Sequence, residues 1–565
     1  MQRYCNTKDL GGALEAAKAL HERMRGPVRK QEALLRTALD RDGSTEECIG
    51  DVVENYTYVL DALLGPQMVS GDSTTTVRAA GNGYAQMQAQ SLPHAVKKIQ
   101  QESRFTKELR LAATDFILGW SVLEVRYEDL SLDKSEKAVI PVARHVNMDD
   151  VMPLPGARRW EHAGAFFHRR VTPKSRLKAM AKQDPGGKWK MKVIDGLETI
   201  PGELYYDSDD VYDYEGWMLP DDESQLPGKL EPDGPEFHGV NFMCDQEGNY
   251  LKDPVRRVGP KRAPFYMAGA TQPTDHMYPV SPAVASSKNN DSVEDMHASL
   301  ADKIRKMRTI VFARMGPKDL EGYLEDEVDG VVPVGTNFEM EKALHEVNIQ
   351  GPRREQWDFL NLQRGAMDRV SGITDMQRGE TGSRVSATEA SIVNSASGAR
   401  LDGMIGSFYQ MVEDAVTEQC WALVTDEDIE LALPADSSTD TGMETPVWRG
   451  GLPEDVTYHS LGLEISVANG YRTNPEIMAN RYVRGLDIAM MVGKLKQGFP
   501  ELNDEGILRR IYDTMEVPEL REMVLGEPAP EPQAGGPSPG NGAAVADPRQ
   551  IPQAGAGAPL AMSGL

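Results

Sequence analysis

GITDMQRGETGSRVSATEASIVNSASGARLDGMIGSFYQMVEDAVTEQCWALV, residues 372–424, joins a short polar, glycine-rich segment to one long amphipathic pattern. Glycines at positions 372, 379 and 382 make the backbone of the first fourteen residues permissive. Ser386 and Glu389 then form an S-x-x-E capping box, in which the Ser386 hydroxyl accepts from the amide three residues on and Glu389 reaches back. The stretch predicts a mobile loop over 372–385 and a helix that begins at Ser386.

Apolar side chains in this predicted helix recur at steps of three and four, which indicates one apolar helical face. Because no proline interrupts residues 386–424, the helix would be about 58 Å long at 1.5 Å per residue. We expect the apolar face to be protein core or a subunit interface and not a ligand site. Its members are Leu401, Ile405, Phe408, Val412, Ala415, Val416, Cys420 and Leu423.

The composition describes an acidic globular chain of several domains. It has 565 residues, 40% hydrophobic and 26% charged, with a formal net charge of -26. Such a chain should not bind nucleic acid tightly through its general surface, although it could surround DNA without gripping it.

Targeting and redox signals are few. Cysteines are scattered at positions 5, 48, 244 and 420, so they suggest a reducing compartment and support neither a zinc site nor a disulfide framework. The start MQRYCNTKDLGG has no apolar core of a signal peptide, and the apolar run 116–125 is too short to span a bilayer. We expect a soluble protein made in a cytoplasm.

The first half of the chain predicts helices and then strands. Gly26-Pro27 would separate two early helices, and the alternation in residues 121–127 predicts a strand after Gly119-Trp120. Thr172-Pro173 would open a further helix, because proline is tolerated in a first turn. The helices are expected at 9–25, 28–40, 52–64 and 93–118.

Residues 203–236 are strongly acidic, with twelve Asp and Glu against Lys229 alone. The DSDDVYDYEG part invites comparison with a calcium loop, but it lacks the EF-hand spacing. We interpret the segment as a solvated acidic surface with strand residues interleaved, and we predict no cofactor.

Two helices flank a small insert in the second half. Ser281-Pro282 predicts a helix with serine as cap and proline at the first position. Strand-like runs TIVFA and GVVPV follow within 309–350, and Gly351-Pro352 opens the second helix. The expected apolar stripes are Val293, Met296, Leu300, Ile304 and Met307 on the first helix and Trp357, Leu360, Met367 and Val370 on the second.

Beyond residue 424 the pattern predicts a strand with Leu463, Ile465 and Val467 alternating, followed by helices. The last forty residues contain sixteen Pro or Gly and nine Ala. Such a segment cannot bury enough apolar surface to offset the loss of chain entropy, so we expect disorder over 526–565. The helices are expected at 475–496, 504–515 and 518–525.

This order of parts resembles the portal proteins of tailed bacteriophages. The resemblance covers about residues 90–525, and it departs at Tyr278-Pro279-Val280, where relatives often have a Tyr-Gly pair. It implies a predominantly helical α+β fold of several domains. The parts would be the N-terminal wing at 1–280, a first stem helix at 281–308, a clip at 309–350, a second stem helix at 351–371, a channel loop at 372–385, the long wing helix and returning strand at 386–470, and crown helices at 471–525.

The resemblance also implies a function and partners. The chain would form a dodecameric ring at the unique capsid vertex of the virion, made in the host bacterial cytoplasm. Double-stranded DNA would pass through it without sequence specificity, driven inward by the terminase large subunit and released later through the tail. Further partners would be the head–tail adaptor and tail proteins, the major capsid protein and scaffold, with no membrane.

Basic residues near the helix ends have two interpretations. Lys303, Arg305, Lys306 and Arg308 lie in the last turns of the first stem helix, where they would complement the helix dipole or face DNA or a neighbouring subunit. Arg353 and Arg354 oppose the dipole of the next helix, which favours an external or intersubunit acidic partner.

The loop and the insert supply the remaining candidates. Arg378 and Arg384 in the glycine-rich loop would be either solvent-exposed or in transient contact with DNA phosphates. Ser386 and Glu389 are assigned the structural cap. Within the clip, the residues expected to bind partners are Lys318, Glu321 and Glu325.

Catalytic motifs are absent from the sequence. It contains no G-x-x-x-x-G-K-[ST] and no HExxH, and Gly81-Asn82-Gly83 lacks the third glycine of a dinucleotide fingerprint. We therefore predict that the chain is not an enzyme. The alternatives are another virion structural protein, such as a capsid, adaptor or internal protein, and a DNA-processing enzyme.

Overall fold

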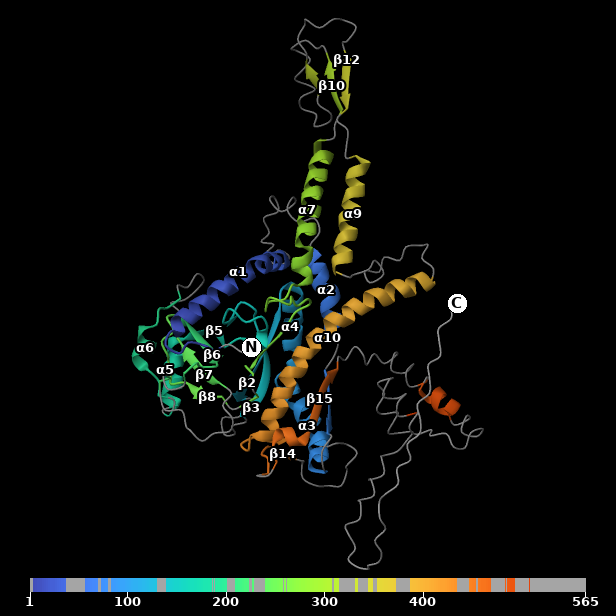
Figure 1. Cartoon of the computed structure of the whole chain (residues 1–565). Helices are drawn as coiled ribbons and strands as arrows, with labels where there is room; N and C mark the ends of the chain where they lie inside the picture. Colours follow the sequence, from blue (N-terminus) through green and yellow to red (C-terminus); the bar gives the residue numbers. More distant parts are fainter. Residues whose placement is uncertain are drawn as a thin grey trace, which may run out of the picture. The chain divides into compact units, whose positions relative to one another are not determined.

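The computed structural model mixes helices and strands, as expected for the α+β class, and divides into two compact units, residues 1–473 and 474–565 (Figure 1). Within the described part of the chain, no helix is long and apolar enough to cross a membrane. The structure describes residues 4–36, 56–69, 73–79, 83–129, 139–184, 186, 188–200, 209–222, 226–227, 239–257, 259–260, 262–306, 309–313, 331–333, 344–348, 353–371, 387–433, 447–453, 456–468, 483, 485–492 and 508.

The chain begins with one helix, α1 (Leu10–Arg36), where two were predicted. Pro27 lies inside it, so the predicted break at Gly26-Pro27 is wrong. Proline removes one helical hydrogen bond, but the buried face continues across it through His21, Arg25 and Val28 at helical spacing. The buried Arg25 guanidinium also pairs with Glu32 in the same helix and with the distant Asp149, so these contacts support the helix on both sides of the proline.

The helix predicted over 93–118 is instead two helices. α3 (Gly83–Glu102) ends and α4 (Phe105–Leu118) begins around Arg104, whose φ of 55° lies in the left-handed region. The Ser103 amide still bonds to the Ile99 carbonyl, so the chain turns within two residues. The predicted helix at 52–64 is confirmed by α2 (Tyr56–Met68), shifted toward the C-terminus.

A three-stranded sheet follows, with the predicted strand at its centre. β2 (Ser121–Asp129) pairs antiparallel with β3 (Val139–Val146) on one side and with β9 (Phe265–Ala268) on the other. α4 packs against β2 and β3, and the long helix α10 (Ala387–Thr425) packs against all three strands.

A second, five-stranded antiparallel sheet carries the middle of the chain. Helix α5 begins at Lys174, directly after Pro173, so the predicted start at Thr172-Pro173 is confirmed to within one residue. The strand order is β4 (Val151–Pro153), β5 (Ala165–Pro173), β6 (Asp210–Met218), β7 (Val240–Cys244) and β8 (Val255–Arg256), with α5 (Lys174–Gln183), α6 (Met191–Gly196) and the 3-10 helix η1 (Trp160–His162) between them.

Strand β6 corrects the interpretation of the acidic segment. Asp213 is fully buried and accepts a hydrogen bond of 3.2 Å from the Arg170 guanidinium, which also pairs with Glu215. These carboxylates are therefore part of a folded sheet with a buried ion pair and not only of a solvated surface. Within the described residues, no three His, Cys, Asp or Glu side chains gather as a metal site.

Helix α10 and the strand after it confirm the predicted pattern. Phe408, Val412, Val416 and Cys420 are all buried on one face of a helix of 39 residues. The predicted strand 463–467 is β15 (Leu463–Ala468), and it pairs with an unpredicted strand, β1 (Thr74–Ala79). The remaining elements here are β13 (Glu430–Ala432), β14 (Val447–Arg449) and the 3-10 helix η5 (Tyr458–Leu461).

The two helices predicted to flank the insert, and strands within the insert, are also present. α7 (Pro282–Lys306) and α9 (Arg354–Ser371) lie side by side, and the insert forms a small sheet in the order β11-β10-β12 (Figure 1). The predicted runs TIVFA and GVVPV contain β10 (Thr309–Ala313) and β11 (Val331–Pro333), whereas β12 (Leu344–Asn348) was not predicted.

In the unit formed by residues 474–565, residues 485–492 are helical and fall inside the predicted helix 475–496. Leu508 is the one described residue of the predicted helix 504–515. The predicted helix 518–525 and the tail 526–565 lie outside the described residues.

Candidate interaction surface of the helical hairpin

A buried serine sets the base of the α7–α9 hairpin. The Ser281 hydroxyl accepts from the Val284 amide at 3.1 Å and donates to the Leu118 carbonyl at 2.8 Å. The first bond is the predicted N-cap, and the second ties the start of α7 to the end of α4. Next to it, the ring of Tyr278 packs edge-on against Trp120 with the centroids 4.8 Å apart. The start of α7 is therefore fixed by both polar and aromatic contacts.

The seam between the two helices combines a polar contact with buried apolar side chains. His297 Nε2 lies 3.1 Å from a guanidinium nitrogen of Arg364, and both side chains are partly buried. Val293 and Leu300 of α7 and Leu360 and Met367 of α9 belong to one cluster of buried apolar side chains. All four apolar side chains are buried, so the predicted stripe positions at the seam are confirmed.

Other apolar residues of the hairpin face outward. Trp357 and Val370 were expected on the same side as Leu360, but they lie roughly 60–80° around the helix from it at 100° per residue. Because α7 covers only the strip of α9 around Leu360, Trp357 and Val370 on either side of that strip stay about half exposed. The exposed fractions are 44% for Trp357, 41% for Phe359, 60% for Leu362 and 42% for Val370 on α9, and 49% for Ile304 on α7.

These five residues, which we call the outer apolar set, are large side chains on one short hairpin. Apolar side chains scattered singly over a surface are ordinary, but several on one element mark a surface that another protein covers. Ile304 lies within the predicted stripe of α7, so its exposure is a correction of that expectation. The set is the strongest feature of the hairpin for association.

Three predicted basic residues lie near the end of the hairpin that leads to the insert. Lys303 near the end of α7 and Arg353 and Arg354 at the start of α9 are all exposed. Arg354 has an exposed partner in its own helix, since its Nε lies 3.8 Å from Asp358 Oδ2, and such a pair contributes little to stability. The Arg353 amide donates to the Gln356 side chain at 3.1 Å. All three predicted residues are thus exposed on the two helix termini that flank the insert.

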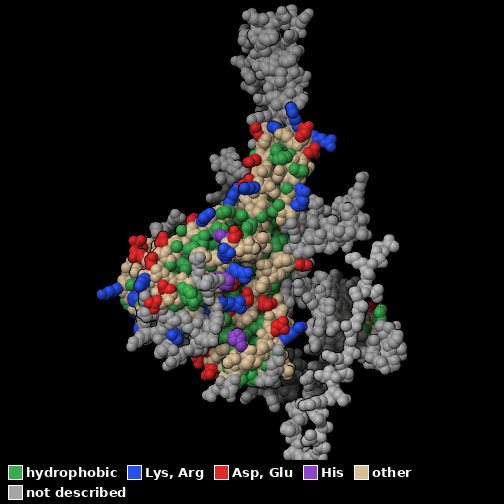
Figure 2. Space-filling view, viewed as in Figure 1, with side chains coloured by type: hydrophobic (Ala, Val, Ile, Leu, Met, Phe, Trp, Pro, Cys, Tyr) green, Lys and Arg blue, Asp and Glu red, His purple; other side chains and the backbone are tan. Residues whose placement is uncertain are grey.

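The net charge of the hairpin contrasts with that of the chain. Residues 282–306 hold four acidic and four basic side chains, and residues 353–371 hold three acidic and four basic ones, so the pair carries +1 against -26 for the whole chain. Figure 2 shows the apolar, acidic and basic side chains interleaved along it. The hairpin is thus nearly neutral in an acidic protein.

Several predicted site residues are not placed by the structure. Arg305 and Lys306 belong to α7, and Glu389 belongs to α10, but their side chains lie outside the described part. Outside the described residues altogether are Arg308, Lys318, Glu321, Glu325, Arg378, Arg384 and Ser386.

One important cluster was missed by the sequence interpretation. Glu418 of α10 accepts hydrogen bonds from Arg257 and from the Tyr266 hydroxyl on β9. Burial raises the pKa of Glu418, and the two donors oppose that shift. The nearby Arg262 guanidinium bonds to Asp414 at 2.8 Å. The available signal was a glutamate that interrupts the apolar face of α10 beside Ala415.

Comparisons with known proteins are sparse. No family model matches the chain, and no curated protein matches its sequence. Among solved structures, it is similar to a chain of the "Virion of native gene transfer agent (GTA) particle", with 12% identity and a TM-score of 0.34 over 69% of this chain and 80% of that chain. At this TM-score the likeness assigns neither a fold nor a function.

Proposed function

We propose that this protein is a phage portal protein, a ring of twelve copies at one capsid vertex through which double-stranded DNA is packaged and later ejected. The observation that carries the proposal is the hairpin: α7 and α9 pack together, the β10–β12 sheet lies between them in sequence, and α10 follows. This is the order of parts expected of stem, clip and wing helix. The hairpin also presents the outer apolar set, which needs a covering partner.

A closed ring explains why a single chain leaves that set exposed. Burying apolar area contributes about 25 cal/mol per Å², so five half-exposed large side chains favour association. The set lies on different sides of one helical hairpin, with Trp357 on the opposite side of Leu360 from Phe359 and Val370, so neighbouring copies on both sides would cover it with different surfaces. Repeated head-to-tail contacts of that kind close into a ring when the rotation between copies divides a full turn.

The charge balance suits a passage for DNA. Each phosphate that a protein neutralises releases counterions and adds salt-dependent affinity, so a strongly basic wall would hold the polyanion in place. A nearly neutral hairpin with a few basic residues, including Lys303 and Arg353, would let DNA slide. Nucleotide-binding motifs are absent from the sequence, so the energy would come from the terminase large subunit.

The partners follow from the same assignment. The insert at 309–350, with Lys318, Glu321 and Glu325, would contact terminase during packaging and adaptor or tail proteins afterwards. The wing would contact the capsid protein and scaffold. In this proposal the protein acts as a component of the virion.

The proposal is tested on the purified full-length protein by native mass measurement and negative-stain microscopy. We expect a closed ring, and we expect Phe359→Glu with Leu362→Glu to yield folded monomers. Leu111→Glu, at an exposed leucine of α4, is the matched control and should leave the ring intact. A wild-type protein that stays monomeric at high concentration, with or without scaffold, would contradict the ring.

A further inference from the structure

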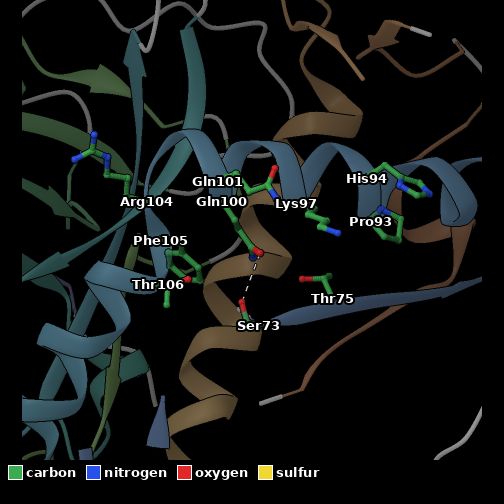
Figure 3. A pocket seen from close by; sticks show the side chains of 10 residues that line it. All are labelled: Ser73, Thr75, Pro93, His94, Lys97, Gln100, Gln101, Arg104, Phe105 and Thr106. Atoms are coloured by element: carbon green, nitrogen blue, oxygen red, sulfur yellow. Dashed lines mark hydrogen bonds between the residues drawn. The ribbon is translucent and has the colours of Figure 1, made fainter. Parts of the chain in front are cut away.

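A hollow of about 470 Å³ lies where α3, β1 and the start of α4 meet (Figure 3). Lys97 and Gln100 point from α3 toward Ser73 and Thr75, which line the opposite wall. The hollow is in the range of volumes that hold small ligands, about 300–1,000 Å³.

The chemistry of the lining favours an anion. Its ten residues include no carboxylate, in a chain with 87 Asp and Glu against 61 Lys and Arg. Pro93 and Phe105 supply apolar surface. The others are basic or neutral hydrogen-bonding residues, namely His94, Lys97, Arg104, Ser73, Thr75, Thr106, Gln100 and Gln101. Arg104 and Gln101 turn their side chains away from the hollow, so Lys97 is its principal cation (Figure 3).

Two polar atoms at the wall have unused hydrogen-bonding capacity. The Ser73 hydroxyl lies 3.5 Å from Gln100 Oε1, whereas Gln100 Nε2 and Thr75 Oγ1 are buried and have no partner in the described structure. Buried polar groups are nearly always satisfied by protein, water or a ligand. A rotation about the soft terminal torsion of Gln100 would turn its amide into the hollow.

The N-terminus of α4 adds a partial positive charge that favours an anion in the hollow. Phe105 and Thr106, its first residues, line the hollow, and no side-chain hydrogen bond caps this helix. The N-terminus of a 14-residue helix carries partial positive charge and attracts anions.

We propose that this hollow binds a small organic anion. Its oxyanion end, phosphate or carboxylate, contacts Lys97, Thr75 and Gln100, and its compact body lies against Pro93 and Phe105. The site is separate from the hairpin and does not depend on the ring, so it goes beyond the proposed function.

The experiment measures thermal unfolding and calorimetric binding of the full-length protein with three probes: inorganic phosphate, AMP and citrate. Ionic strength is held constant with sodium chloride. We expect a saturable rise in Tm for at least one probe, because a ligand that binds the folded state stabilises it. A larger rise in Tm with AMP than with phosphate would identify a phosphorylated ligand with an organic body. A larger rise with citrate than with either of the others would identify a carboxylate ligand.

Matched variants locate the binding. Lys97→Met and Thr75→Val should each lower, at least tenfold, the affinity for the probe that binds. Lys98→Met should not, because Lys98 is on the same helix but lies 3.6 Å from Glu102. Lys97 is exposed, so its variant should fold, and its Tm without ligand checks this directly. No saturable response to any of the three probes, or an equal response in Lys97→Met, would overturn the proposal.

Discussion

Arg257, which follows β8, donates a hydrogen bond to Glu418 of α10, 161 residues away, and each of these residues is only 6% exposed. The Tyr266 hydroxyl on β9 donates to the second oxygen of the same carboxylate. A buried ion pair is weak evidence of net stability, but removing one partner leaves the other charge without compensation. This cluster therefore fixes where α10 packs against the sheet of β3, β2 and β9.

The first prediction concerns that cluster. Glu418→Ala should lower the free energy of unfolding by about 3–5 kcal/mol, because it leaves the Arg257 guanidinium buried and unpaired. Asp414→Ala, which removes the more exposed partner of Arg262, should cost less than about 1 kcal/mol. Urea unfolding of both variants measures the difference. Equal losses in the two would show that burial of Glu418 does not matter.

The second prediction is a pH dependence. Burial, and then the neighbouring Arg25, lower the pKa of His21 to about 4 from its usual 6.5. The unfolded chain therefore binds a proton more readily than the folded one. The contribution of neutral His21 is complete above pH 6.5 and is lost as the pH falls toward 4, by roughly 3 kcal/mol.

His21→Phe serves as the comparison, because the ring still packs near Trp120 but cannot titrate. The difference in unfolding free energy between wild type and variant, measured from pH 7.5 to 4, should shift in favour of the variant as pH falls. A constant difference across that range would mean that His21 is not buried in its neutral form.

The third prediction concerns the turn between α3 and α4. Arg104 has a φ of 55°, which strains any residue with a Cβ. Arg104→Gly should leave stability unchanged or raise it by up to about 1 kcal/mol, whereas Arg104→Val should lower it by about 1–2 kcal/mol. Thermal unfolding ranks the three proteins. If the valine variant is as stable as the glycine variant, the backbone at this turn is not left-handed.

The fourth prediction extends the proposed portal function to the loop 372–385. Arg378→Ala with Arg384→Ala should leave ring assembly unchanged but alter the length of packaged DNA or its retention. Phosphate contacts weaken with salt, so the effect should be larger at low ionic strength. Particles with normal DNA content and retention at both low and high salt would show that these arginines make no functional DNA contact.

Periodicity and helix-capping residues, which are local in the sequence, correctly predicted α10 and the start of α7. The face through Phe408 and Val416 follows one helical period without interruption, and Ser281 is followed by proline, so α10 and the start of α7 could be predicted. Across Pro27 the helix persists because Arg25 pairs with a distant residue, Asp149, which no local pattern reveals.

Non-local pairing accounts for the other differences. Strand β1 has the sequence TTTVRA, with little alternation, and exists through its pairing with β15 nearly 400 residues later. The Arg257–Glu418 contact likewise joins distant segments. On α9, periodicity placed Trp357 on the same face as Leu360. In the structure Leu360 is buried whereas Trp357 is 44% exposed, because a single packed helix covers only a narrow strip of α9. The candidate residues in the loop 372–385 and the insert remain predictions.

The polar contact between His297 and Arg364 specifies how α7 and α9 align along their axes. Sliding one helix past the other by a turn, about 5.4 Å, would break this contact and move both polar side chains along a seam that contains buried apolar residues. The contact therefore favours one axial register between α7 and α9.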